Sequence, residues 1–318
     1  MNNQIKRDEF NYRLSSFLYE KGKLESKKIS MIKAHVFFLE AVNGDELIVK
    51  KHRNKENVDQ QWHFFDAVDE SQIVPFINFP NGQKVISSNH SSWTISPYIQ
   101  GDKLYYKRSD DRKEAIRTLQ KFHNSASNIS VAKPIIKDSM FIRWYRRLLN
   151  FKKTEMIFKE HGFMNLYKDI VQMTIAHFRF AAKFPWESKE KSALESGLWI
   201  HGDVASHNFL RNDNTYLIDF DLLQCTAQIY DYIQLGQRFL PYLNWDLERF
   251  LSYRIVKESE LKPLLYAIFI PSDLLREWLY FISSGKKSSV YNYLYDMEKE
   301  WLKRLTFLKH AKSMLKSL

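Results

Sequence analysis

One short segment, residues 199–221, concentrates the polar residue types that could do chemistry; it reads WIHGDVASHNFLRNDNTYLIDFD. Asp203 follows His201 and a glycine, Asn208 comes five residues later, and Asp219 interrupts an apolar run. A carboxylate in an aliphatic strand is costly unless it is paired or bound to a metal ion. Asn208 and Asp219 could together hold Mg²⁺, which needs few protein ligands. Asp203 could accept the proton of an attacking hydroxyl.

A predicted hairpin brings the two candidate metal ligands together. Short apolar runs at 209–210 and 216–218 flank the turn-forming residues 212–214. This pattern predicts a small β-hairpin, in which Asn208 and Asp219 occupy neighbouring positions. Asp203 precedes the hairpin, on the loop that enters it.

Each of these residues taken alone also has a plainer interpretation. Asp203 could cap a helix, Asn208 could occupy a turn, and Asp219 and Asp221 could flank a loop. The joint spacing of the whole segment is far more specific than any one residue, and it favours the chemical interpretation.

The first half of the chain is predicted to be rich in β-structure. The expected elements are a helix at 8–21, a hairpin over 35–51 with its turn at Asn43-Gly44-Asp45, a helix at 55–68, a strand pair punctuated by Pro75, Pro80 and the Asn81-Gly82 turn, and a strand at 92–99. Asn-Gly is a strong hairpin signal because it tolerates positive φ angles.

The second half is predicted to be mainly helical. Helices are expected within 110–126, over 139–182 and from residue 229 onward, with a loop or short helix at 183–196. Apolar residues at 294, 297, 301, 305 and 308 give the last helix a clear apolar face. We therefore predict an α+β fold in two lobes: a β-rich lobe at 1–97, a connection at 98–101 and a helical lobe at 102–318. A cleft between lobes is the default place for a ligand.

Composition excludes several classes of protein. The 318 residues are 44% hydrophobic and 27% charged, which excludes a disordered or fibrous chain. The single cysteine, Cys225, excludes a disulfide framework and a cysteine-based zinc or iron–sulfur site. One cysteine also fits the reducing cytoplasm, where we expect the protein to be located.

The charge balance of 48 Lys+Arg against 37 Asp+Glu gives a net charge of +11, so the surface attracts anions. The basic residues are spread along the chain rather than gathered in one block, which argues against a nucleic-acid-binding tail. The start of the sequence lacks the apolar core of a signal peptide, and no run of 18 apolar residues occurs, so we expect no membrane span. The sequence makes no prediction of an oligomeric state.

Motifs of several large enzyme classes are missing from the sequence. It contains no GxxxxGK[ST], GxGxxG, HExxH, GxSxG or CxxC pattern. P-loop NTPases, Rossmann dehydrogenases, zincins and α/β-hydrolases are therefore not indicated.

The His-Gly-Asp segment resembles the catalytic loop of aminoglycoside phosphotransferases and choline kinases, a branch of the protein-kinase-like fold. The resemblance implies that Asp203 is the catalytic aspartate, that His201 supports the loop, and that Asn208 and Asp219 bind the metal ion. It also implies that Asp231 braces the loop from a later helix. Within this branch the chain resembles the bacterial, spore-coat-associated CotS-like group, which implies association with spores.

The resemblance extends to the first half. Lys50 follows the Asn-Gly turn and resembles the lysine that contacts ATP phosphates, with Ile48 on the same strand face beneath adenine. Lys51 points to the other face of the strand and is the other candidate for this role. Alternatively, Lys50 is simply a strand lysine that faces solvent. Tyr98 resembles part of the lobe connection that binds adenine.

Three departures from the family pattern concern the nucleotide site. The first turn, near Ser30–Ala34, holds no glycine to cradle phosphates. The acidic partner of Lys50 is not evident: Glu56 is acidic but early, and Gln60 and Gln61 occupy the expected place. Asp221 replaces the glycine of the protein-kinase Asp-Phe-Gly pattern, a variation common in enzymes that act on small molecules.

The resemblance implies a phosphotransferase that uses ATP and Mg²⁺ to phosphorylate a small-molecule hydroxyl. A protein-kinase activation segment is not indicated, because no Ala-Pro-Glu follows Asp219. The net positive charge favours a neutral or anionic acceptor over a polycationic one, unless an acidic patch lies in the helical half. A catalytically weak or inactive protein with a structural role, such as a spore coat component, is the alternative. Nucleic-acid binding through the aromatic and basic stretch 143–147 is a third hypothesis. Packing of that helix in the core and at its rim explains the stretch better.

Overall fold

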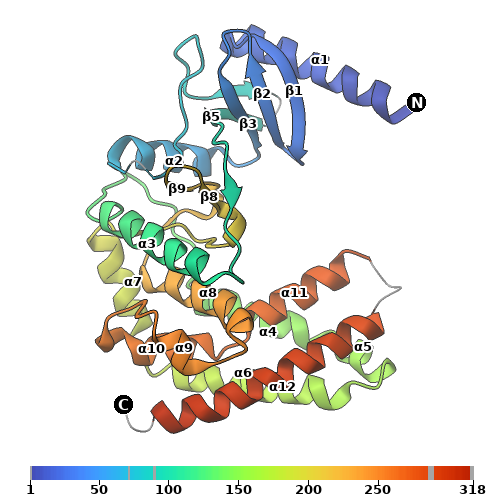
Figure 1. The fold of residues 1–318 in the computed structure, drawn as a ribbon, viewed down its shortest axis with the longest axis vertical. Coiled ribbons are helices and arrows are strands. Elements are labelled where there is room, and N and C mark those ends of the chain that lie inside the picture. The colour runs from blue at the N-terminus through green and yellow to red at the C-terminus, as the bar shows by residue number, and fades with distance from the viewer. Residues whose placement is uncertain (1, 71, 89–90, 286–289, 316–318) are drawn as a thin grey trace.

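The computed structural model describes residues 2–70, 72–88, 91–285 and 290–315. A small sheet packs at one end of a larger helical part (Figure 1). The sheet is antiparallel, with strand order β1-β2-β3-β5-β4. The elements of this first part are α1 (Asn2–Gly22), β1 (Ser26–Lys33), β2 (Val36–Ala41), β3 (Glu46–His52), α2 (Lys55–Ala67), β4 (Ile86–Ser88) and β5 (Ser91–Pro97).

The β2–β3 hairpin forms where the sequence predicts it. Gly44 has a φ of 90°, and the side-chain oxygen of Asn43 accepts a hydrogen bond from the Asp45 amide at 3.1 Å. The register pairs Phe38 with Ile48. Alternation along β3 then separates the buried Leu47 and Val49 from Ile48 and Lys50 on the opposite face.

The segment after α2 is less regular than the sequence predicts. Instead of a continuous strand pair around Pro75 and Pro80, Ile73 and Ile77 form isolated bridges to Leu217 and Ile95. The two prolines lack the N–H groups that a ladder needs, which accounts for the interruption. The predicted Asn81-Gly82 turn is present, with Gly82 at φ 82°.

The rest of the chain is mainly helical, as predicted, and the α+β fold class is confirmed. Its helices and strands are β6 (Asp102–Lys103), α3 (Ser109–Ser125), α4 (Met140–Lys152), α5 (Glu155–Glu160), α6 (Met164–Ala181), α7 (Trp186–Glu195), β7 (Trp199–Ile200), η1 (Ser206–Asn208), β8 (Phe209–Arg211), β9 (Thr215–Leu217), η2 (Phe220–Leu222), β10 (Gln224–Cys225), α8 (Ile229–Phe239), η3 (Leu240–Leu243), α9 (Leu247–Leu251), α10 (Glu258–Ile268), α11 (Ser272–Ser283) and α12 (Val290–Leu315). None of the helices in the described ranges is long and apolar enough to cross a bilayer.

The sheet part and the helical part each have their own cluster of buried apolar side chains. The sheet has its own cluster, which includes Leu18, Leu39 and Val49. The larger cluster of the helical part also includes Phe64 of α2, which lies 5.3 Å from Trp199 between ring centroids. Helix α2 is therefore anchored in the helical core, although it lies within the predicted first lobe. The predicted boundary at 98–101 follows the end of β5 and remains a prediction.

Candidate active site

The loop that carries Asp203 is held in place by one buried carboxylate. Asp231 on α8 is fully buried, and its two oxygens accept hydrogen bonds from the amides of His201 and Gly202 at 2.8 and 2.9 Å. His123 of α3 lies 3.0 Å from the same carboxylate. Gly202 has a φ of 82°, and a Cβ there would collide with the carbonyl oxygen of Leu222. The loop conformation therefore depends on both Asp231 and a glycine at 202.

His201 lies inside this loop rather than facing an open cavity. Its ring is buried, Nδ1 accepts a hydrogen bond from the Asp203 amide at 3.2 Å, and Nε2 lies 2.9 Å from the carbonyl oxygen of Ile218. Because Nδ1 accepts, Nε2 carries the proton and donates to Ile218. His201 thus joins the loop to the hairpin and positions Asp203 by its backbone.

The β8–β9 hairpin brings Asn208 next to the segment that carries Asp219. The Ile218 amide donates to the Asn208 carbonyl oxygen at 3.0 Å, one residue before Asp219. Asn208 Nδ2 donates to the Asp203 carbonyl oxygen at 2.9 Å. This hydrogen bond commits the amide nitrogen, so Oδ1 is the side-chain atom that can serve as a ligand.

Asp219 occupies a backbone conformation that non-glycine residues rarely adopt, with φ 65° and ψ 64°. Lys50 Nζ donates to Oδ1 at 2.6 Å, and Lys33 Nζ donates to Oδ2 at 2.9 Å. Burial by itself raises the pKa of Asp219, but the two ammonium groups hold that pKa well below its usual range. The carboxylate therefore stays ionised over the whole physiological pH range.

Lys50 is the β3 lysine that reaches the hairpin. Its Nζ also lies 2.7 Å from a carboxylate oxygen of Asp221, and only 16% of its side chain is exposed. Burial acts to lower the pKa of Lys50, but Asp219 and Asp221 outweigh burial and raise it. Lys51 points to the other face, where its Nζ lies 5.6 Å from the ring centre of Trp93.

Ile48 and Tyr98 lie near each other through Phe38. Phe38 is the cross-strand partner of Ile48, and its ring packs edge-on against Tyr98 at 4.9 Å. The Tyr98 amide donates to the Glu46 carbonyl oxygen at 2.9 Å, which joins the start of the connecting segment to β3. This apolar corner lies on the same face of β3 as Lys50.

Helix α2 supplies no partner to Lys50 among the described residues. Glu56 is exposed in the first turn of α2 and forms no ion pair there. The side chain of Gln60 is buried and engaged elsewhere: Nε2 donates to the Leu223 carbonyl oxygen at 3.0 Å, and Oε1 accepts from the Ile135 amide at 2.6 Å. The carboxylates that pair with Lys50, Asp219 and Asp221, come instead from the segment that follows the hairpin.

Sequence reasoning missed the contributions of three side chains to this site. Lys33 and Arg238 were not considered, and Asp221 was not expected to pair with Lys50. Arg238 Nη2 lies 2.6 Å from Asp203 Oδ1. Arg238 follows Asp231 by seven residues, which is two helical turns, so both project from one face of α8. That spacing was the available signal for Arg238.

A cavity of about 130 Å³ opens beside Asp203 on the side of the helical part. It is lined mainly by polar and charged side chains of α4, α8 and the start of α11. Trp144 of α4 is buried at its wall, so packing accounts for this aromatic residue of the 143–147 stretch.

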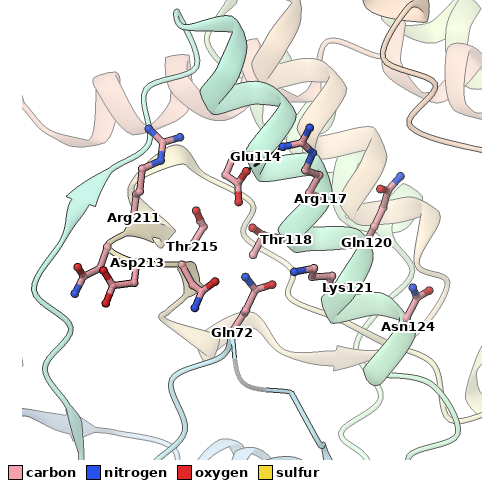
Figure 2. A pocket seen from close by; sticks show the side chains of 12 residues that line it. Gln72, Glu114, Arg117, Thr118, Gln120, Lys121, Asn124, Arg211, Asp213 and Thr215 are labelled. Atoms are coloured by element: carbon pink, nitrogen blue, oxygen red, sulfur yellow. Dashed lines mark ion pairs between the residues drawn. The ribbon is translucent and has the colours of Figure 1, made fainter.

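A wider groove of about 580 Å³ lies elsewhere, between α3 and the β8–β9 turn. Figure 2 shows Arg117, Thr118 and Lys121 of α3 facing Arg211 and Asp213 of the hairpin across this groove. None of the residues that carry the catalytic pattern lines it, so its larger volume does not make it the reaction site.

Comparisons with known proteins identify the family and the fold. The model of the phosphotransferase enzyme family matches residues 30–245. An aminoglycoside phosphotransferase from Alicyclobacillus acidocaldarius has a similar structure, with a TM-score of 0.68 at 16% identity over 92% of this chain and 93% of that one. No curated protein sequence matches the chain significantly.

Two other solved structures share the fold. A spectinomycin phosphotransferase in complex with ADP and spectinomycin has a TM-score of 0.60 at 12% identity, covering 90% of this chain and 94% of that one. An aminoglycoside phosphotransferase in complex with GDP and kanamycin has a TM-score of 0.60 at 14% identity, covering 91% and 98%. The predicted resemblance to aminoglycoside phosphotransferases is thus confirmed, and the spore-coat subgroup stays a prediction. With a family match over more than half its length, the chain belongs to the phosphotransferase enzyme family.

Proposed function

We propose that the protein transfers the γ-phosphate of ATP, with Mg²⁺, to a hydroxyl group of a small molecule. The observation that carries this proposal is the hydrogen bond from Lys50 of the sheet to Asp219, just after the hairpin. Asn208, at the start of the same hairpin, is in turn hydrogen-bonded to the loop that presents Asp203. Phosphoryl transfer depends mainly on positioning and electrostatics, so this small set of groups is sufficient.

In this proposal the nucleotide binds along β3. Adenine packs on the apolar corner of Ile48, Phe38 and Tyr98, and its edge faces the backbone of the connecting segment 98–101, in which the Tyr98 amide already donates to Glu46. Lys50 and Lys33 then contact the phosphates. Both ammonium groups already converge on one carboxylate, so cationic charge is concentrated at the place that would receive the phosphates.

The residues present fit Mg²⁺. Asn208 Oδ1 and the Asp219 carboxylate are hard oxygen donors, and Mg²⁺ prefers one or two such ligands together with phosphate and water. The low pKa of Asp219 keeps its carboxylate ready to bind a cation. When bound, the ion would offset the negative charge on the phosphate oxygens.

Asp203 receives the proton in the transfer step. As the acceptor hydroxyl loses this proton, its oxygen forms a bond to the γ-phosphorus. The bond from that phosphorus to the β–γ bridging oxygen breaks, and ADP leaves with the electron pair. Arg238, at 2.6 Å, fixes the Asp203 side chain while leaving its second oxygen for the acceptor.

Thermal melting with ATP, with and without Mg²⁺, tests this site. A ligand at 100 times its Kd stabilises a protein by about 2.7 kcal/mol. We expect a Mg²⁺-dependent rise in Tm that Asp219→Asn abolishes. Asp213→Asn is the matched control, because Asp213 is an exposed aspartate in the turn of the same hairpin.

A Mg²⁺-independent shift, or an equal shift in Asp219→Asn, would contradict the proposed metal ligands. Asp203→Asn should keep the nucleotide shift and abolish transfer, since the carboxylate acts on the acceptor and not on ATP. Absence of any shift at millimolar ATP would favour the second candidate function.

The second candidate is a kinase-like protein with weak or no turnover and a structural role, such as a spore coat component. Gln60 favours it, because this neutral side chain replaces the acidic partner expected for Lys50. The glycine-free turn between β1 and β2 also favours it. That turn contains His35 at φ 69°, where a glycine would leave room for phosphate oxygens.

A further inference from the structure

Four arginines surround the small cavity beside Asp203. Arg143 and Arg147 come from α4, Arg238 comes from α8, and Arg276 comes from α11. Arg143 and Arg147 are four residues apart and therefore share one face of their helix. Three helices thus direct guanidinium groups toward the place where an acceptor would meet Asp203.

The carboxylates of this cavity are already committed to other arginines. Asp203 pairs with Arg238 at 2.6 Å, and Asp273 pairs with Arg304, from α12, also at 2.6 Å. Within the described ranges, Arg143 and Arg147 form no ion pair. Arg276 has only the exposed Glu277 at 4.0 Å, a pair that contributes little. Among the described residues, Arg143 and Arg147 therefore lack a carboxylate at ion-pair distance, and Arg276 has only this weak pair. Glu190, Asp138 and Asp273 act on Arg143 and Arg147 only from farther away.

These charges destabilise one another. Burial, together with the neighbouring Arg276 and Arg143, lowers the pKa of Arg147 to about 10. Arg143 has a buried Nε without a hydrogen-bond partner in the described structure, and burial lowers its pKa too. Half-buried cations that repel one another cost folding energy unless an anion joins them. Clusters of this kind are typical of sites built for a ligand.

Two further features of the cavity favour negative charge. The N-terminus of the twelve-residue helix α11 lies at its wall, where the helix dipole favours anions. Arg147 Nη1 donates to Ser272 Oγ at 2.7 Å, which fixes the guanidinium at that helix start. A guanidinium fork matches the paired oxygens of carboxylate and phosphate groups.

We propose that the acceptor carries an anionic oxyacid group, a phosphate or a carboxylate, which Arg143, Arg147 and Arg276 bind while its hydroxyl faces Asp203. This inference rests on the proposed function, because it takes Asp203 as the group that receives the acceptor's proton. A polycationic acceptor is excluded from this cavity by like charge. The volume of about 130 Å³ is below the ~300–1,000 Å³ usual for ligand pockets, so the bound group is small.

The test measures anion binding directly, without nucleotide. Inorganic phosphate is titrated against the full chain at constant ionic strength set with potassium chloride, and Tm is recorded. The experiment uses the double variant Lys33→Met, Lys50→Met as background, which removes both cations that could bind phosphate at the proposed nucleotide site. Acetate and kanamycin are titrated in parallel as the carboxylate and the polycationic probe.

Arg147→Gln and Arg276→Gln are the informative variants. Arg276 is 45% exposed, so its replacement should not prevent folding. Arg146→Gln is the matched control: it lies on the same helix, is 61% exposed and pairs with Asp138 away from the cavity. Loss of one charge-assisted contact should weaken phosphate binding about tenfold or more in either informative variant, with no change in the control.

Saturable stabilisation by phosphate that Arg147→Gln and Arg276→Gln weaken would support the proposal. A larger effect of acetate than of phosphate would assign the anionic group as a carboxylate. No effect of either anion, or equal effects in all variants, would overturn it, as would stabilisation by kanamycin that the variants leave unchanged. Failure of the proposed function is seen separately, as absence of the Mg²⁺–ATP shift in the wild-type chain.

Discussion

Arg238 Nη2 lies 2.6 Å from the carboxylate of Asp203. Arg238 comes two helical turns after Asp231 on α8. One face of α8 thus fixes both the backbone of the proposed catalytic loop, through Asp231, and the side chain that the loop presents, through Arg238. The spacing of two residues on one helix sets the geometry of the proposed reaction.

Arg238→Met should lower kcat for ADP formation by about 10- to 100-fold, with the KM for ATP unchanged, because Asp203 loses its orientation while the nucleotide contacts remain. Arg238→Lys should restore part of the rate by keeping the charge. Arg249→Met, at an exposed arginine on α9, is the control for loss of a guanidinium. A proportional rise in KM for ATP would contradict a role confined to Asp203.

Asp231→Asn should destabilise the fold by roughly 2–4 kcal/mol in urea unfolding. The amide nitrogen of asparagine would face a donor amide in place of an acceptor oxygen, in a site without water access. Asp246→Asn should change stability by less than ~0.5 kcal/mol, because Asp246 is an exposed helix cap and asparagine caps equally well. Equal stabilities of the two variants would show that Asp231 does not brace the loop.

Gly202→Ala should cost roughly 2 kcal/mol more than Gly162→Ala in the same unfolding assay. Both glycines have nearly equal φ values, 82° and 83°, so the conformational strain of about 1–2 kcal/mol is common to both. Only Gly202 has the Leu222 carbonyl oxygen in the path of a new Cβ, whereas nothing lies within 4 Å at Gly162. The difference between the variants measures the close approach of loop and η2, and equal costs would rule that approach out.

Stability should fall as the pH drops from 7 to 5, in part through His177. Burial lowers the pKa of this histidine to about 4, assisted by Lys312 and Arg304, so the unfolded chain binds a proton near pH 6.5 that the folded chain does not. The contribution of the neutral His177 to the free energy of unfolding is fully present above pH 6.5 and is lost as the pH falls toward 4. The loss is roughly 2 kcal/mol at pH 5.

His177→Phe should flatten that part of the pH dependence in urea titrations at pH 5 and 7. The ring of His177 already packs edge-on against Phe269 at 5.4 Å, so an aromatic replacement keeps the packing. His63→Phe, at an exposed position on α2, should leave the pH dependence unchanged. An unchanged slope in His177→Phe would assign the pH effect to other groups.

Local sequence signals were sufficient where a short-range rule governs the structure. Asn43-Gly44 fixed the position of the first hairpin, and the turn formers at 212–214 fixed the second. The placement of Asn208 beside the Asp219 segment followed from that hairpin alone. Spacing in a single segment was therefore enough to predict most of the candidate site.

Contacts between distant segments were beyond the same rules. The sequence suggested a partner for Lys50 in α2, but the carboxylates that reach it are those of Asp219 and Asp221, 169 and 171 residues later in the chain. Tertiary packing decides which segment lies against Lys50. From the sequence, Arg143 and Arg147 were interpreted as residues that pack one helix against the core. No local signal showed that Arg276 lines the same cavity. The sequence showed that Pro75 and Pro80 punctuate a strand pair. It did not show how few strand hydrogen bonds remain, because the bridge at Ile73 depends on Leu217, a distant residue.

The hydrogen bonds of Gln60 have a mechanical consequence. Its amide nitrogen is bound to Leu223 and its amide oxygen to Ile135, and Phe64 packs on Trp199, so α2 is fastened to the helical part. We therefore expect any closing movement over a nucleotide to pivot the five-stranded sheet relative to α2. Lys50 would travel with the sheet while Asp219 stays fixed, so the ion pair between them is the contact that such a pivot stretches or shortens.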